Sequence, residues 1–143
     1  MLARMTANPR QSRMEIRPRF YETDMMGIVH HANYLKYMEV GRVDWWRKRG
    51  ITPQTWPDVQ LPVYEVKIQY KRPATFDEQL VVTTTLLEGK PHTLIYRYEI
   101  TRRDELLCTG ETQMIVVSPQ FRICRLGPDK MAQVMGGETG LIA

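Results

Sequence analysis

Residues 33–50, NYLKYMEVGRVDWWRKRG, carry the one long helical pattern of this 143-residue chain. The apolar positions fall along a single stripe at helical spacing, formed by Tyr34, Leu35, Tyr37, Met38, Gly41 and Trp45. Asn33 suits a helix cap and Gly50 suits a helix end. Gly41, inside the pattern, should cost about 1 kcal/mol relative to alanine, so we expect the helix backbone to approach another element closely there.

Strand patterns lie on both sides of this helix. Apolar and charged residues alternate from Arg13 to Tyr21, the period of a half-buried strand. After the helix, the alternation and the β-branched residues predict four strands separated by turns, over residues 64–70, 79–88, 94–101 and 106–117, and then a short helix over 129–135. Strands joined by short turns should form an antiparallel meander, and a lone amphipathic helix packs across such a sheet. The expected fold class is therefore α+β, with a five-stranded antiparallel sheet partly wrapped around one long helix.

Composition indicates one globular domain, since 43% of the residues are hydrophobic and 25% are charged. We assign residues 14–143 to this domain and residues 1–13 to a flexible basic N-terminal arm. The sequence contains no run of about 20 apolar residues that could span a membrane, and the arm lacks the apolar region of a secretory signal. A cytoplasmic location follows as an expectation, with Cys108 and Cys124 reduced.

The net charge of +4 is concentrated at the start of the chain. Five arginines and two glutamates lie within the first 22 residues, so this segment carries +3 and the remaining residues carry only +1. A nearly neutral body argues against a general nucleic-acid surface. RNA binding through the basic arm remains a rival hypothesis, and it predicts a strongly salt-dependent affinity.

Reactive side chains are concentrated in residues 21–34, YETDMMGIVHHANY. Asp24 and Gly27 stand at the first and fourth positions of a possible type I turn, which is a purely structural role for Asp24. His30 and His31 are adjacent and His92 is the only other histidine. Because neighbouring histidines rarely bind one metal together, we expect no metal site.

The same segment also has a functional interpretation. A loop that leads into a helix aims the unpaired N–H groups near residues 30–33 outward, where they can bind an anion or a developing oxyanion. Asp24 is close enough in sequence for its carboxylate to face this point. A carboxylate opposite such donors can attack a thioester carbonyl or activate a water molecule against it.

The string YETDMMGIVHHANYL, followed by Glu39 and Arg42, resembles the bacterial hot-dog thioesterase family typified by 4-hydroxybenzoyl-CoA thioesterase and the YbgC-like acyl-CoA thioesterases. The family pattern is matched at Asp24, Gly27, Ile28, Val29, His31, Tyr34, Leu35, Glu39 and Arg42. The chain departs from it at His30, where the family more often has tyrosine or tryptophan. The strand and helix order read from periodicity agrees with the hot-dog fold.

The resemblance implies roles for individual residues. Asp24 would be the catalytic nucleophile or general base, and the N–H and imidazole of His31 would polarise the thioester carbonyl and orient the substrate or a water molecule. The proposed substrate-binding residues are Gly27, His30, Tyr34, Lys71, Arg72 and Lys90, of which the three basic ones are candidates for the phosphates of coenzyme A. Glu39 and Arg42, three residues apart on the helix, are expected to form an ion pair with each other.

The implied activity is hydrolysis of an acyl-CoA thioester without a cofactor. The resemblance further implies a homo-oligomer, a tetramer built from dimers, with the sites between protomers. Two alternatives stay open, namely dehydration of a hydroxyacyl thioester and non-catalytic binding of an acyl thioester by a scaffold protein. Neither the acyl group nor its carrier, coenzyme A or an acyl-carrier protein, follows from the residues.

Overall fold

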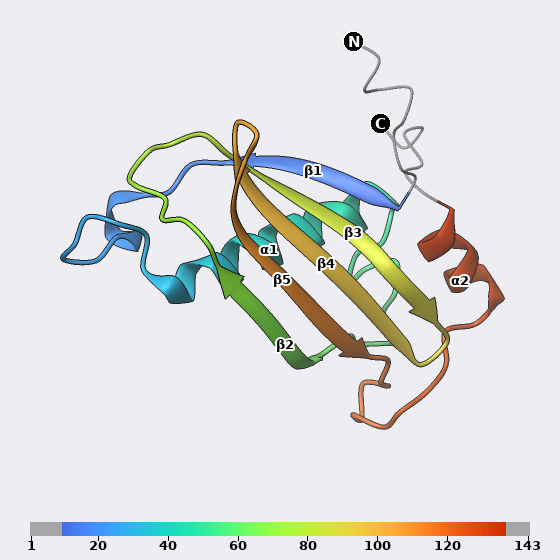
Figure 1. Cartoon of the computed structure of the whole chain (residues 1–143). Coiled ribbons are helices and arrows are strands. Elements are labelled where there is room, and N and C mark those ends of the chain that lie inside the picture. The colour runs from blue at the N-terminus through green and yellow to red at the C-terminus, as the bar shows by residue number, and fades with distance from the viewer. Residues whose placement is uncertain (1–9, 137–143) are drawn as a thin grey trace, which may run out of the picture.

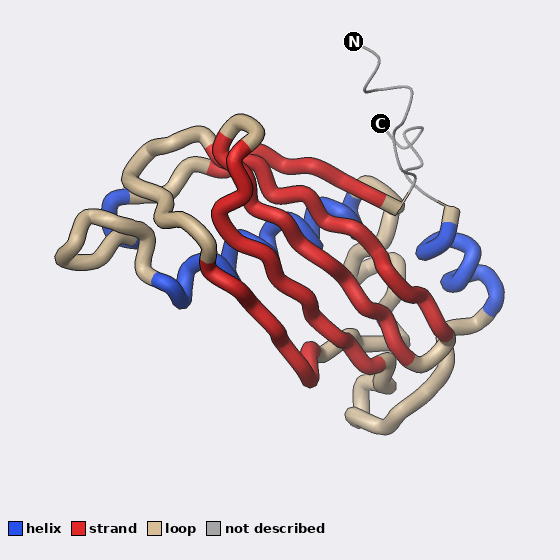
Figure 2. Tube along the Cα trace, viewed as in Figure 1, coloured by secondary structure: helices blue, strands red, loops and turns tan. Residues whose placement is uncertain are grey.

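The computed structural model describes residues 10–136 of the chain (Figure 1). Its elements, in chain order, are β1 (Gln11–Ile16), the short 3-10 helix η2 (Phe20–Glu22), α1 (His31–Arg47), β2 (Val63–Tyr70), β3 (Leu80–Lys90), β4 (Thr93–Arg102), β5 (Glu105–Ile115) and α2 (Pro128–Met135). The five strands form one antiparallel sheet, and α1 crosses one of its faces (Figure 2). The predicted α+β architecture is confirmed.

The order of strands in the sheet is β1-β3-β4-β5-β2. The meander holds for β3, β4 and β5, which are joined by tight turns, but it is wrong for β2. That strand pairs with β5 at the edge opposite β1. The reason is the connection over residues 71–79, which is long enough to carry the chain from one edge of the sheet toward the other.

The first strand is shorter and begins earlier than the sequence predicts. β1 begins at Gln11, so residues 11–13, predicted to belong to the arm, pair with β3. It ends at Ile16, and Phe20–Glu22 form η2 in place of the expected end of the strand. Pro18, which lies between them, has no N–H to donate to a sheet. Residues 1–9 of the predicted arm lie outside the described residues.

Helix α1 packs closely on the sheet at Gly41, as its position in the helix predicts. A Cβ atom at Gly41 would lie 2.7 Å from Cγ1 of Val82 and 2.8 Å from Oγ1 of Thr84, both on β3. Gly110 on β5 gives similar room to the sulfur of Met38. These two contacts let α1 lie directly on the central strands and bury Trp45 against Tyr96.

The expected ion pair between Glu39 and Arg42 is not formed. Arg42 is buried and points into the core, where its Nη1 donates to the hydroxyl of Tyr98 at 3.0 Å, while Glu39 is exposed. Burial raises the pKa of Tyr98, so its hydroxyl stays protonated beside the guanidinium. The three-residue spacing places the two residues near one turn of the helix, but Arg42 is directed to the sheet and Glu39 to the surface.

Two smaller expectations concern the cysteines and the membrane. Cys108 and Cys124 are both free thiols. Between residues 10 and 136, no helix is long and apolar enough to cross a membrane.

Candidate active site

The loop that carries Asp24 is fixed at its base by backbone pairing. Thr23 forms an antiparallel bridge with Val29, and Ile28 forms another with Thr75. Between these pairs, the N–H of Gly27 donates to the carbonyl of Asp24 at 3.0 Å, which closes the predicted turn. Gly27 adopts a φ of 81°, a left-handed conformation that favours glycine. The turn therefore holds Asp24 in one place at the edge of the fold.

One carboxylate oxygen of Asp24 belongs to this turn. Its Oδ1 accepts a hydrogen bond from the N–H of Met26 at 2.8 Å, as an Asx turn requires. Its Oδ2 accepts no hydrogen bond from the residues that the structure describes. Asp24 thus combines the structural role with a second oxygen that remains available for chemistry.

Helix α1 begins three residues earlier than the sequence predicts, because its cap is not Asn33. The cap is His30, whose Nδ1 accepts from the N–H of Ala32 at 3.1 Å. Asn33 instead lies in the first turn and donates from its side chain to the carbonyl of Glu22 at 2.7 Å. Histidine is an uncommon cap, and the asparagine is the stronger local signal.

The cap leaves one backbone donor of the first turn open. The N–H of Ala32 is used by the His30 ring, and the N–H of Asn33 donates to the His30 carbonyl at 2.9 Å. Within residues 10–136, the N–H of His31 has no acceptor. It is also the amide to which the family resemblance gives the role of polarising the carbonyl.

Asp24 and His31 line the same cavity, which has a volume of about 340 Å³. The full lining is Asp24, Met26, Ile28, Val29, His31, Tyr34, Tyr70, Lys71, Arg72 and Pro73. Five of the eight predicted site residues are therefore brought together: Asp24, His31, Tyr34, Lys71 and Arg72. A carboxylate and a helix N-terminus meet in a partly apolar hollow, which is suited to polarising a carbonyl group.

Tyr70 is the main residue of the cavity that the sequence did not single out. Its hydroxyl donates to the carbonyl of His31 at 3.1 Å, and its ring packs edge to face with His31 and Tyr34. The hydroxyl of Tyr34 in turn accepts from the N–H of Ala74 at 3.1 Å, and burial raises the pKa of Tyr34. These contacts fix the start of α1 against the end of β2. The sequence gives one hint that Tyr70 belongs to the site: it ends an alternating strand directly before Lys71, a predicted binding residue.

The other predicted binding residues do not line this cavity. Gly27 and His30 lie next to lining residues of the cavity. Gly27 closes the turn that holds Asp24, and His30 caps α1. The structure does not bring Lys90 to this cavity. Lys90 lies at the opposite end of the sheet, where it pairs in register with Thr93 and forms an ion pair with Glu88 at 3.3 Å. Its turn resembles the turns near the site in sequence but lies far from them in space.

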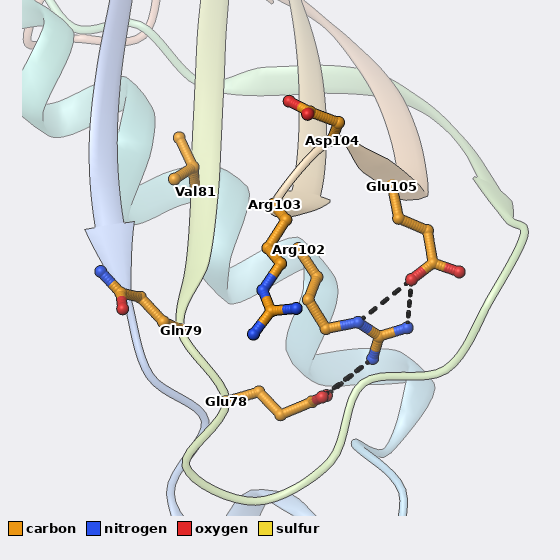
Figure 3. A pocket seen from close by; sticks show the side chains of 7 residues that line it. All are labelled: Glu78, Gln79, Val81, Arg102, Arg103, Asp104 and Glu105. Atoms are coloured by element: carbon orange, nitrogen blue, oxygen red, sulfur yellow. Dashed lines mark hydrogen bonds and ion pairs between the residues drawn. The ribbon is translucent and has the colours of Figure 1, made fainter.

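A larger, open and strongly charged hollow adjoins the cavity (Figure 3). Arg102 at its centre binds Glu78 at 2.8 Å and Glu105 at 2.6 Å, and Figure 3 shows its guanidinium held between the two carboxylates. Arg72 belongs to this network as well, since its Nε lies 3.2 Å from Glu105. Lys71 forms no ion pair with the residues that the structure describes, and it is exposed at the mouth of the cavity. Of the two, Lys71 is the freer cation for a phosphate.

The nearby cysteine is not a suitable nucleophile. Cys108 is buried on β5, directly opposite Tyr70. Burial raises the pKa of its thiol to about 12, so the thiol stays protonated at neutral pH. Among the described residues, no group of three or more His, Cys, Asp or Glu side chains could hold a metal ion.

The fold is that of a hot-dog thioesterase, and the loop that carries Asp24 leads into the N-terminus of the central helix. Residues 26–109 match the family model described as the thioesterase superfamily. This segment is more than half of the chain, and the chain belongs to that superfamily. The predicted family is confirmed.

Individual relatives point the same way. The chain is 40% identical over 91 residues to the Bacillus subtilis protein named "Putative acyl-CoA thioesterase YneP", an alignment that covers 62% of this chain and 66% of that protein, just under two thirds. It is 30% identical to acyl-CoA thioesterase YbgC of Haemophilus influenzae, over 71% of this chain and 77% of the relative.

The fold is also that of a solved enzyme. The crystal structure described as a DHNA-CoA thioesterase from Staphylococcus aureus superposes with a TM-score of 0.80 at 31% identity, covering 86% of this chain and 87% of that one. The agreement extends beyond the residues 26–109 that match the family model, so the sheet and the helix are shared as a whole.

Proposed function

We propose that the protein hydrolyses an acyl-CoA thioester to a free acid and coenzyme A at the Asp24 cavity. The observation that carries this proposal is the pairing of a carboxylate oxygen without a partner, on Asp24, with an amide N–H without a partner, on His31, among the described residues and in one cavity of a thioesterase-superfamily chain. Relatives named acyl-CoA thioesterases support coenzyme A as the carrier.

In the proposed reaction, the thioester carbonyl oxygen accepts a hydrogen bond from the His31 N–H. The positive end of the α1 dipole then stabilises the charge that develops on this oxygen. Asp24 has two possible roles. It attacks the carbonyl carbon and forms an anhydride that water cleaves, or it removes a proton from a water molecule that attacks directly. In both cases coenzyme A leaves as the thiolate and takes up a proton.

The second candidate function is non-catalytic binding of an acyl thioester. It is favoured by the hydrogen bond between Asp24 and Met26, because that contact alone would explain an aspartate at this position. The two functions differ in whether a thiol is released.

An acyl-CoA panel separates these functions. We expect free coenzyme A to appear in equal amounts with free acid for at least one of short aliphatic, long aliphatic and aromatic acyl-CoA thioesters, as followed with a thiol reagent. Tight binding of the same compounds in calorimetry without any thiol release would contradict the hydrolase and favour the binding protein. The matching acyl-carrier-protein thioester, tested beside the best acyl-CoA, decides which carrier is used.

We further propose that the working unit is a homodimer joined through β2, from which the expected tetramer would be built. Among residues 10–136, this strand pairs with β5 alone, and its helix-facing side chains Val63, Val66 and Tyr70 are 37%, 39% and 50% exposed. A free edge with an apolar face is a site of further strand pairing. Two copies related by a two-fold axis would pair these edges antiparallel and cover both apolar faces.

Light scattering at micromolar concentration checks this assembly. We expect a mass of two or four times 16.8 kDa. Val66→Lys places charge on the proposed interface and should shift the mass toward the monomer, whereas Lys67→Ala on the neighbouring, outer-facing position should not. A wild-type monomer would contradict the proposal.

A further inference from the structure

The peptide that joins His31 to Ala32 is held at both ends. Its carbonyl accepts a hydrogen bond from the hydroxyl of Tyr70 at 3.1 Å, and its N–H donates to Nδ1 of His30 at 3.1 Å. The preceding peptide carries the open N–H of His31, and its carbonyl accepts from the N–H of Asn33 at 2.9 Å. The direction of the His31 N–H, which the proposed function assigns to the thioester carbonyl, therefore depends in part on His30.

Only one form of the His30 ring can make this bond. A neutral imidazole has one nitrogen that accepts and one that donates, whereas a protonated imidazole has two donors and no acceptor. This is also the position at which the chain departs from the family pattern, where tyrosine or tryptophan is more common. Neither of those rings has a nitrogen that accepts. A cap that responds to its own charge therefore comes with the histidine at this position.

The titratable and charged groups around His30 come from α1 and η2. The ring of His31 stacks on it with centroids 4.2 Å apart, so the two rings would repel each other if both were charged. The start of α1 adds the positive end of the helix dipole. Glu22 of η2 accepts the N–H of His30 through its backbone carbonyl at 2.9 Å. Its carboxylate is occupied elsewhere, because Oε1 accepts from the N–H of Arg19 and from the hydroxyl of Tyr37. Among residues 10–136, the His30 ring forms no ion pair with a carboxylate, so protonation would place an unpaired positive charge beside the helix start.

We propose that His30 is a positioning residue, whose neutral ring holds the start of α1 in the form that directs the His31 N–H at the thioester carbonyl, and whose protonation removes this form. This inference rests on the proposed function. Protonation leaves the N–H of Ala32 without its acceptor, and Tyr70 alone then holds the peptide. Because charge on the carbonyl oxygen develops in the transition state, the loss should fall on kcat and leave KM within about twofold.

Two substitutions of His30 separate the cap from the charge. His30→Ala removes the cap and should lower kcat at pH 8 by about 2- to 30-fold, the range that corresponds to the loss of a helix cap. His30→Asn supplies an amide oxygen, which is a preferred cap and does not titrate, and it should recover most of this loss. If His30→Asn is no faster than His30→Ala, the imidazole has another role and the proposal is overturned.

The dependence of kcat on pH tests the role of the charge. Histidine side chains titrate between about pH 5 and pH 8, so wild-type kcat should fall as the pH is lowered through this range, by the same factor of about 2- to 30-fold. His30→Asn should lack this fall. His31→Ala and His92→Asn are the matched controls, because they remove the other two histidines of the chain and should keep it. A fall that persists in His30→Asn would overturn the proposal, and its loss in His31→Ala would assign the titration to the neighbouring ring.

NMR spectroscopy tests the same link without any substrate. At pH 8 the His30 ring should carry its proton on Nε2, and the amide signal of Ala32 should shift together with the ring signals of His30 as the pH is lowered. In His30→Asn, the amide of Ala32 should no longer shift in this range. A proton on Nδ1 at pH 8, or an Ala32 amide that does not follow His30, would overturn the proposal. If Ala32 follows His30 but no acyl-CoA is hydrolysed at any pH, the cap is supported and the proposed function is wrong.

Discussion

Asp24→Asn should lower the rate of thioester hydrolysis by about 10²- to 10⁴-fold, the usual loss when a general base is removed. The fold should be unaffected, because the asparagine oxygen can still accept the N–H of Met26 and asparagine also favours this turn. What is lost is the charge on the second oxygen, the one without a partner among the described residues. Substrate should then accumulate on the variant.

The measurement is thiol release by wild type and variant on the best substrate of the acyl-CoA panel, together with thermal melts. Asp104→Asn is the matched control, since it removes the same charge from an exposed turn outside the Asp24 cavity. His31→Ala completes the series. It keeps the backbone N–H and removes the ring that stacks on His30, so a partial loss is expected. Equal turnover and equal melting of wild type and Asp24→Asn would reduce Asp24 to a turn residue.

The elements can be predicted from the sequence because they depend on local periodicity. The alternation that ends at Tyr70 and the stripe through Trp45 each report on one face of one element. The place of β2 in the sheet depends instead on a connection of nine residues, 71–79, and nothing local in that segment states which edge the chain will reach.

The site residues also divide into those that a local pattern predicts and those that only the sheet topology brings together. Asp24 and His31 come from one continuous segment, so a local pattern is enough to predict that they lie together. Tyr70 and Pro73 reach the cavity from the far edge of the sheet, and only the pairing of β2 with β5 places them there. The prediction for Lys90 depends on its position in a turn, and turns at opposite ends of a sheet look alike in sequence.

Gly41 shows where a local signal does report a non-local contact. A glycine inside a strong helical pattern is unfavourable by itself, so its presence indicates a close neighbour, which is β3. Substituting it should therefore destabilise the protein in proportion to the size of the new side chain. We expect Gly41→Ala to lower the free energy of unfolding by about 1 kcal/mol and Gly41→Val by about 3 kcal/mol, in the range of overpacked cores.

The sign of the change in unfolding free energy for Gly41→Ala tests the close packing of α1 on β3. In an exposed helix, replacing glycine by alanine would stabilise the protein by about 1 kcal/mol. Here the new Cβ would meet Val82 at 2.7 Å and Thr84 at 2.8 Å, well inside the roughly 3.5–4.0 Å of ordinary carbon contacts. Both side chains are fully buried and belong to a strand paired on both sides, so neither can move away easily. Urea unfolding of the two variants, with Lys36→Ala on the exposed side of α1 as the control, measures the effect. A Gly41→Ala protein more stable than wild type would mean that α1 can shift away from the sheet, and the close packing of helix on strand would then not hold the fold at this point.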